Sequence, residues 1–70
     1  MMNMKPVESS NIAEIGYDNE HNVLHVAFHT GSVYAYEDVP YQMYEDMLNA
    51  PSVGKYFNEN VRDMFVTTKL

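Results

Sequence analysis

The 70-residue chain contains no cysteine and no tryptophan, and it has four basic side chains against ten acidic ones. The absence of cysteine excludes disulfide bonds and thiolate metal ligands, so packing alone must hold the fold together. A formal net charge of −6 opposes non-specific attraction to a polyphosphate, and any nucleic-acid site must therefore be local. No apolar run approaches the roughly 20 residues that span a bilayer, and the amino end lacks the apolar core of a signal peptide. We therefore expect a cytoplasmic protein without a membrane segment.

The residues that are present predict one small folded domain. Apolar residues make up 46% of the chain, and tyrosine and methionine each occur six times, which suits a core filled by large and adaptable side chains. A chain of this length buries only about 60% of its unfolded surface, so no second domain fits. We expect a flexible lead-in over residues 1–8, a single domain over residues 9–66 and a tail over residues 67–70.

Alternation of apolar and polar residues predicts three consecutive strands in the first half of the chain. The segment IAEIGY places Ala13, Ile15 and Tyr17 on one face, and Gly16 indicates a bulge or a close backbone approach. The segment VLHVAFHT alternates most cleanly, and VYAYE forms the third strand. Short turns join the three strands, which predicts an antiparallel meander.

The second half of the chain has the period of helices. Asp38 and Pro40 mark the start of a first helix, because a carboxylate favours the positive amino end and proline is tolerated in the first turn. Pro51 ends that helix, and Ser52 caps a second one. The apolar residues of the second helix recur at spacings of three or four: Val53, Tyr56, Phe57, Val61, Met64 and Phe65. The predicted fold is α+β, a three-stranded antiparallel meander followed by two helices packed on one face (β-β-β-α-α).

The loop between the second and third strands decides whether Tyr34 and Tyr36 are core or exposed. A two-residue loop at Thr30 and Gly31 would turn both tyrosines to the exposed face. A three-residue loop that begins at His29 and ends in a left-handed glycine would turn them into the core. Threonine is unfavourable at the positive φ that the shorter loop requires, so we favour the longer loop and buried tyrosines.

Four motifs in order carry a resemblance to a known family. They are VESSNIAEIGYD, the alternating LHVAF, GSVYAYEDVP with its Tyr-x-Tyr pair, and APSVGKYFNENVRDMF. Together they resemble the KTSC domain, which is named for its place at the carboxyl end of some lysyl-tRNA synthetases, and the likeness runs from Val7 to about Phe65. The family also occurs as small stand-alone proteins of bacteria and their phages. The synthetase context suggests RNA binding.

The family pattern falls on particular positions of this chain, and at Tyr34, Tyr36 and Pro40 we expect its role to be mainly structural. The matched positions are Ser9, Ser10, Gly16, Tyr17, Gly31, Tyr34, Tyr36, Val39, Pro40, Ala50, Ser52, Gly54, Tyr56, Phe57 and Asn58.

The segment PSVGKYFN contains the best candidate for a phosphate site. Ser52, Gly54 and Lys55 fall in the first turn of the second helix, where free backbone N–H groups and the positive end of the helix dipole attract an anion. Tyr56 is adjacent, and Arg62 lies about 10.5 Å further along the same helical face if the helix continues. The alternative is a plain serine cap, with Gly54 allowing another segment to approach the helix closely.

Metal binding and catalysis find no support in the sequence. His25 and His29 on one strand lie about 13 Å apart at 3.3 Å per residue, which is too far to share an ion, so we expect no metal and no cofactor. The chain has no serine-histidine-aspartate order, P-loop or zinc spacing, so we do not expect an enzyme. We expect a non-enzymatic binding module for RNA or another phosphate ligand, with weak and salt-sensitive affinity. The alternative is an acidic protein–protein adaptor or a phage-encoded inhibitor of a host protein.

Overall fold

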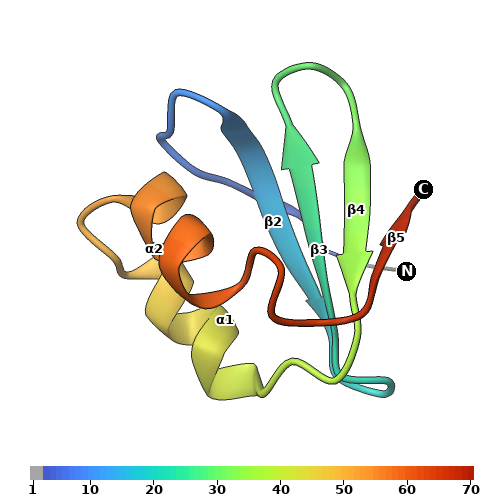
Figure 1. The fold of residues 1–70 in the computed structure, drawn as a ribbon. Helices are drawn as coiled ribbons and strands as arrows, with labels where there is room; N and C mark the ends of the chain where they lie inside the picture. The colour runs from blue at the N-terminus through green and yellow to red at the C-terminus, as the bar shows by residue number, and fades with distance from the viewer. Residues whose placement is uncertain (1–2) are drawn as a thin grey trace.

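A computed structural model describes residues 3–70 and contains one antiparallel sheet with two helices on one of its faces (Figure 1). The sheet order is β1-β2-β3-β4-β5, with each strand beside its neighbour in sequence. The predicted α+β class, the central meander and the two following helices are confirmed. The elements are β1 (Lys5–Pro6), β2 (Ile12–Asp18), β3 (Val23–Phe28), β4 (Val33–Tyr36), α1 (Tyr41–Leu48), α2 (Val53–Asn60) and β5 (Thr67–Lys69).

The sheet has five strands, so the prediction of three strands was incomplete. The two additional strands lie at its edges, β1 in the segment predicted as a lead-in and β5 in the predicted tail. Residues 1 and 2 of that lead-in lie outside the described residues. β1 pairs with Glu14 and Ile15, and β5 pairs with β4. Both strands are too short for alternation to reveal them, since their pairing depends on an edge that the meander supplies.

The hairpin between β3 and β4 has the predicted three-residue loop. Gly31 is left-handed with φ +96°, and its N–H donates to the Phe28 carbonyl at 2.9 Å. Leu24 therefore pairs with Tyr36, and Val26 pairs with Tyr34. Tyr36 is 5% exposed and Tyr34 is partly buried, so both tyrosines lie on the helix side of the sheet as predicted.

β2 has a bulge near its start. The sequence suggested a bulge at Gly16 as one of two interpretations, and that interpretation was wrong. The register shifts between Ile12 and Glu14, whereas Gly16 lies in regular register with β3. The extra residue changes the parity of the strand, so that Ile12 and Ile15 are both fully buried although they are three positions apart. Ala13, which strict alternation assigns to the core face, is only partly buried.

Helix α1 begins after Pro40 without a side-chain cap, so the predicted role of Asp38 was wrong. Pro40 is the N-cap with φ −61° and ψ 140°, and the first turn contains no acidic residue. Asp38 lies outside the helix and has φ +56°. The carboxylate therefore belongs to the turn that leads from β4 to the helix. At the other end Asn49 caps α1 and donates its side-chain amide to the Glu45 carbonyl at 2.9 Å.

Helix α2 has the predicted serine cap but ends earlier than predicted. The Ser52 hydroxyl accepts the backbone N–H of Lys55 at 3.3 Å. The helix ends at Asn60 and is followed by a turn in which Asp63 has φ +63°. Met64, predicted as a core residue of the helix, is 66% exposed, because the chain leaves the helix to reach the edge of β4.

The core lies between the sheet and the helices, and aromatic rings connect its two layers. Tyr36 on β4 meets Phe57 on α2 edge to face, with ring centroids 5.6 Å apart. Tyr17 on β2 stacks on Tyr44 of α1 at 5.5 Å and donates its hydroxyl to the Val39 carbonyl. The buried cluster is Ile12, Ile15, Tyr17, Leu24, Val26, Tyr36, Val39, Tyr44, Met47, Val53, Phe57 and Val61.

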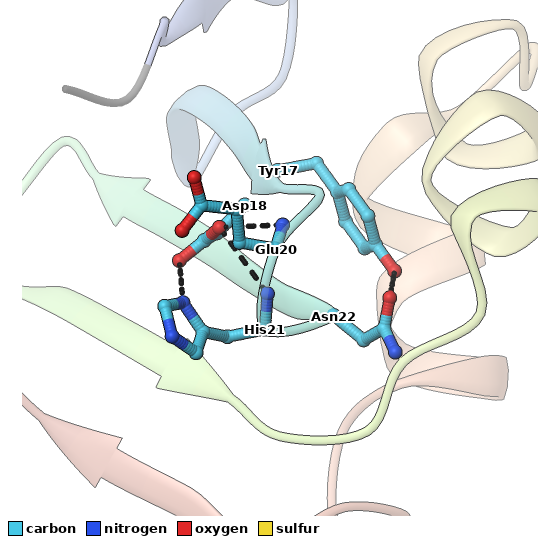
Figure 2. A network of polar contacts seen from close by, with 5 residues as sticks. All are labelled: Tyr17, Asp18, Glu20, His21 and Asn22. Atoms are coloured by element: carbon cyan, nitrogen blue, oxygen red, sulfur yellow. Dashed lines mark hydrogen bonds and ion pairs between the residues drawn. The ribbon is translucent and has the colours of Figure 1, made fainter.

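The turn between β2 and β3 is organised by the Asp18 carboxylate (Figure 2). It accepts the backbone N–H groups of Glu20 and His21 at 2.9 and 3.4 Å, and it meets the His21 ring nitrogen Nδ1 at 2.9 Å. The hydrogen bond from His21 holds the pKa of Asp18 below its ordinary value. The same bond raises the pKa of His21 above 6.5. At pH values between these two pKa values the Asp18 carboxylate is ionised and the His21 ring is protonated, so the two form an ion pair.

We expect Tyr36→Ala to lower the free energy of unfolding by about 3 kcal/mol or more, because it leaves a cavity between β4 and α2. Tyr36→Phe, which keeps the ring, should change it by less than about 1 kcal/mol. Urea unfolding measures both values. A loss within about 0.5 kcal/mol for Tyr36→Ala would show that the ring is not part of the core.

We expect the His21 ring to titrate above 6.5 in the folded protein and to return toward 6.5 in Asp18→Asn. Because the folded pKa is raised, the stabilisation from protonated His21 is complete below 6.5 and is lost as the pH rises through the folded pKa. Asp18 also stabilises the fold, but its pH dependence runs in the opposite direction. Because its folded pKa is lowered, its stabilisation is complete above the unfolded pKa and is lost as the pH falls through the folded pKa. Proton NMR of the ring measures the midpoint, and an unchanged midpoint in Asp18→Asn would contradict the assignment.

Candidate functional site

A cleft of about 580 Å³ opens between the β3–β4 hairpin and the carboxyl end of α2. We call it the aromatic cleft. Four separate parts of the chain form it: the loop before β2, the hairpin, the end of α2 with its following turn, and β5. Its lining residues are Ser10, Asn11, Phe28, His29, Thr30, Ser32, Tyr34, Tyr36, Phe57, Asn58, Arg62, Asp63 and Thr67.

Four aromatic rings in edge-to-face contact form the apolar part of the cleft. Phe28 is the centre of the group, with its ring 5.7 Å from Tyr34 and 5.6 Å from Phe57, and Tyr36 completes the chain of rings through Phe57. Tyr36 and Phe57 are 5% and 4% exposed and belong to the core. Phe28 and Tyr34 are only partly buried. These two rings can therefore contact a ligand without any rearrangement of the core.

The rim of the cleft is polar, and Arg62 gives it a permanent positive charge. The Arg62 side chain is 65% exposed, and its Nε lies 3.9 Å from the Asp63 carboxylate, a long contact that leaves the guanidinium open to a ligand. Burial raises the pKa of Tyr36 to about 12, so its hydroxyl stays protonated at neutral pH. His29 is held in place, with its ring Nε2 3.0 Å from the Ser9 carbonyl.

The structure divides the predicted site residues into two groups. Tyr34, Tyr36 and Arg62 line the aromatic cleft. Ser52, Gly54, Lys55 and Tyr56 lie at the start of α2 and do not line it. Pro40, at the amino end of α1, is also absent from the cleft and acts as a helix cap. Because α2 ends at Asn60, Arg62 does not continue the helical face of Lys55, and this part of the prediction was wrong.

The start of α2 has the features of a close packing contact. A Cβ atom on Gly54 would lie 3.0 Å from Asn11 Oδ1 and 3.2 Å from Ser9 Oγ, so the loop before β2 uses the absence of a side chain there. Ser52 caps the helix by accepting from Lys55 N–H. These contacts favour the alternative interpretation of the sequence, a serine cap with a glycine that allows close approach.

The cleft also contains residues that the sequence analysis did not assign to a site. Phe28 lies in the alternating segment VLHVAFHT, for which no binding role was predicted, and Thr67 lies in the segment predicted as a tail. No spacing rule connects them with Arg62, because the cleft forms only when β5 reaches β4. Ser10 and Asn58, by contrast, were among the positions on which the family resemblance falls.

Two further observations concern the whole of the described chain. Within residues 3–70 no helix has the length and apolar character that a membrane span requires. Among the same residues, histidine and carboxylate side chains do not gather in groups of three that a metal ion could join.

Comparisons with known proteins identify the family. The KTSC domain matches residues 8–65. A protein of Tsukamurella paurometabola is 40% identical over 62 residues, which is 89% of this chain and 92% of that protein. A lysine–tRNA ligase of Nostoc punctiforme is also 40% identical over 62 residues, but these are only 11% of the ligase. The crystal structure of a KTSC domain protein from Yersinia pestis has a TM-score of 0.96 and 31% identity, and the match covers 100% of this chain and 99% of that one. The chain therefore belongs to the KTSC domain family.

Proposed function

We propose that the chain is a non-enzymatic module that binds a short single-stranded RNA segment in the aromatic cleft. The observation that carries this proposal is the position of Phe28 and Tyr34, two partly open rings, in the same cleft as the exposed Arg62 guanidinium. Unpaired bases stack on aromatic rings, and a guanidinium binds phosphate oxygens through two parallel hydrogen bonds. One base on the rings and one phosphate on Arg62 account for both features.

The charge of the protein limits the affinity of this site. The net charge is −6, and within residues 3–70 the cleft is lined by one permanent cation, Arg62, with the Asp63 carboxylate beside it. Binding should therefore be weak, and its dependence on salt should be modest, because a single neutralised phosphate gives a slope of only about −0.7 in log affinity against log salt. Stacking on Tyr34 must supply most of the affinity at physiological salt.

Further features agree with RNA as the ligand class. The relatives that contain this domain as 11% of their length are named lysine–tRNA ligases, so the domain occurs in proteins that act on tRNA. His29, which lines the cleft, has its Nε2 3.0 Å from the Ser9 carbonyl, an arrangement that suits a binding surface rather than a general base. An RNA ligand also agrees with the cytoplasmic location that we expect.

We expect the salt dependence of RNA binding to identify the phosphate contact. Fluorescence anisotropy with a labelled, unstructured RNA should give a slope of log affinity against log salt that becomes shallower by about 0.7 in Arg62→Ala. Lys55→Ala is the matched control, since it removes one positive charge from a residue outside the cleft and should leave the slope unchanged. If Lys55→Ala flattens the slope and Arg62→Ala does not, the start of α2 is the phosphate site. If the parent protein binds no RNA even at low salt, the proposal is wrong and the protein-adaptor alternative replaces it.

We expect Tyr34→Leu to weaken RNA binding by fivefold or more, since one stacked base contributes about 1–3 kcal/mol. Leucine keeps an apolar side chain against Phe28, so the cleft should remain folded. Tyr34→Phe retains the ring and should bind RNA within about twofold of the parent. Equal affinity of Tyr34→Leu and the parent would show that no base stacks on this ring.

A further inference from the structure

A second cavity, of about 490 Å³, lies at the opposite end of β3 from the aromatic cleft. We call it the tyrosine pocket. Its lining comes from β1 and the residues before it, from the end of β2 with the turn that follows, and from α1. The residues that matter for its chemistry are Lys5, Tyr17, Asp18, Glu20, Tyr41 and Tyr44.

The three tyrosines form a fixed aromatic wall with one open ring. Tyr41 meets Tyr17 edge to face at 5.4 Å, and it lies at 5.8 Å from Tyr44. Tyr17 and Tyr44 are 9% and 6% exposed, whereas Tyr41 is 48% exposed although it is a large aromatic residue. The contacts with its two neighbours position the Tyr41 ring, and its remaining surface faces solvent. The ring therefore offers a preformed surface, and a ligand that binds to it causes little further loss of side-chain conformational entropy.

The end of β2 and the turn after it add negative charge to the lining of the pocket. Asp18 Oδ1 accepts the backbone N–H of Glu20 at 2.9 Å, and Oδ2 meets the His21 ring at 2.9 Å, so the turn fixes the direction of the carboxylate (Figure 2). Protonated His21 offsets part of the Asp18 charge, so the negative potential for a bound cation is greatest when His21 is neutral. The Glu20 side chain is exposed beside Asp18. Glu45 is near enough to the phenol of Tyr41 to raise the pKa of that phenol, after burial as the larger cause. Lys5 is the one basic side chain that lines the pocket in residues 3–70.

We propose that the tyrosine pocket binds a basic polypeptide segment of another protein, with an arginine guanidinium on the Tyr41 ring and a neighbouring cation at Asp18 and Glu20. The face of an aromatic ring attracts a cation, and arginine also stacks on it through its planar guanidinium. The two carboxylates complement the second cation and would repel a phosphate, which separates this site from the aromatic cleft. The net charge of −6 adds a long-range attraction for a basic partner.

Lys5 gives the proposal a specific consequence. Its ammonium group lines the same pocket as the two carboxylates, so it reduces the negative potential that a bound cation experiences. Removal of this charge should strengthen the binding of a basic segment. If the pocket instead held an anion through Lys5, the same change would weaken binding.

The test uses the whole protein and a blocked hexapeptide with two adjacent arginines flanked by glycines. Its counterpart has citrulline in place of both arginines, which keeps the shape and removes the charge. NMR titration at low ionic strength should move the Tyr41 ring signals and the Glu20 amide, with binding about tenfold tighter for the arginine peptide. Tyr41→Leu should weaken binding about threefold or more, and Tyr41→Phe should stay within about twofold of the parent. Lys5→Gln should bind more tightly.

A charge-matched control separates a site from diffuse attraction to an acidic protein. Glu20→Gln and Glu59→Gln each remove one negative charge, but Glu59 is an exposed residue of α2 that does not line the pocket. We expect only Glu20→Gln to weaken binding by about twofold or more. An equal effect of both variants, equal affinity for the citrulline peptide, or weaker binding by Lys5→Gln would overturn the proposal. None of these outcomes depends on whether the aromatic cleft binds RNA.

Discussion

The left-handed conformation of Gly31 fixes the position of almost everything else in the domain. A loop of three residues between β3 and β4, with the glycine in its last position, places Tyr36 opposite Leu24 and turns both toward the helices. A loop one residue shorter would reverse every side chain of β4 and move the tyrosines to the outer face of the sheet. A Cβ atom added to Gly31 would meet no other segment within 4 Å, so the requirement for glycine is conformational and not steric. The register of one hairpin thus decides both the core and the wall of the aromatic cleft.

The same aromatic rings serve stability and the proposed binding. Phe57 is in edge-to-face contact both with Tyr36, which is buried in the core, and with Phe28, which is only partly buried. In a domain of this size the core is too small to keep separate residues for packing and for a ligand surface. Contacts with the core hold Phe28 and Tyr34 in place, so a ligand that binds them meets rings whose positions are already determined. Loss of Tyr36 would damage the cleft through the fold, which is why Tyr34 is the better position for separating binding from stability.

The sequence was sufficient to predict the features of the fold that depend on residues close together in the chain. Alternation in β3 and β4, the threonine in the hairpin loop and the Ser52 cap each depend on residues close together in sequence, and these three predictions are confirmed. The edge strands, the bulge after Ile12 and the early end of α2 depend on contacts between distant segments. Arg62 illustrates the difference. Helical periodicity extended α2 through it and paired it with Lys55, whereas the need to bring β5 beside β4 ends the helix at Asn60 and turns Arg62 toward the hairpin.

The two proposed sites lie at the two ends of β3, and salt determines whether they affect each other. The six residues of this strand span about 17 Å, which exceeds the Debye length of about 10 Å at 0.1 M salt but not that of about 30 Å at 0.01 M. At physiological salt the carboxylates of Asp18 and Glu20 therefore have little influence on a phosphate at Arg62. At low salt they oppose it, so a basic segment in the tyrosine pocket would relieve that repulsion and strengthen RNA binding. Reciprocity requires the RNA to strengthen binding of the basic segment by the same factor. An acidic domain of this kind could hold a basic protein at one end and a nucleic acid at the other, with each ligand reducing the electrostatic cost of the other.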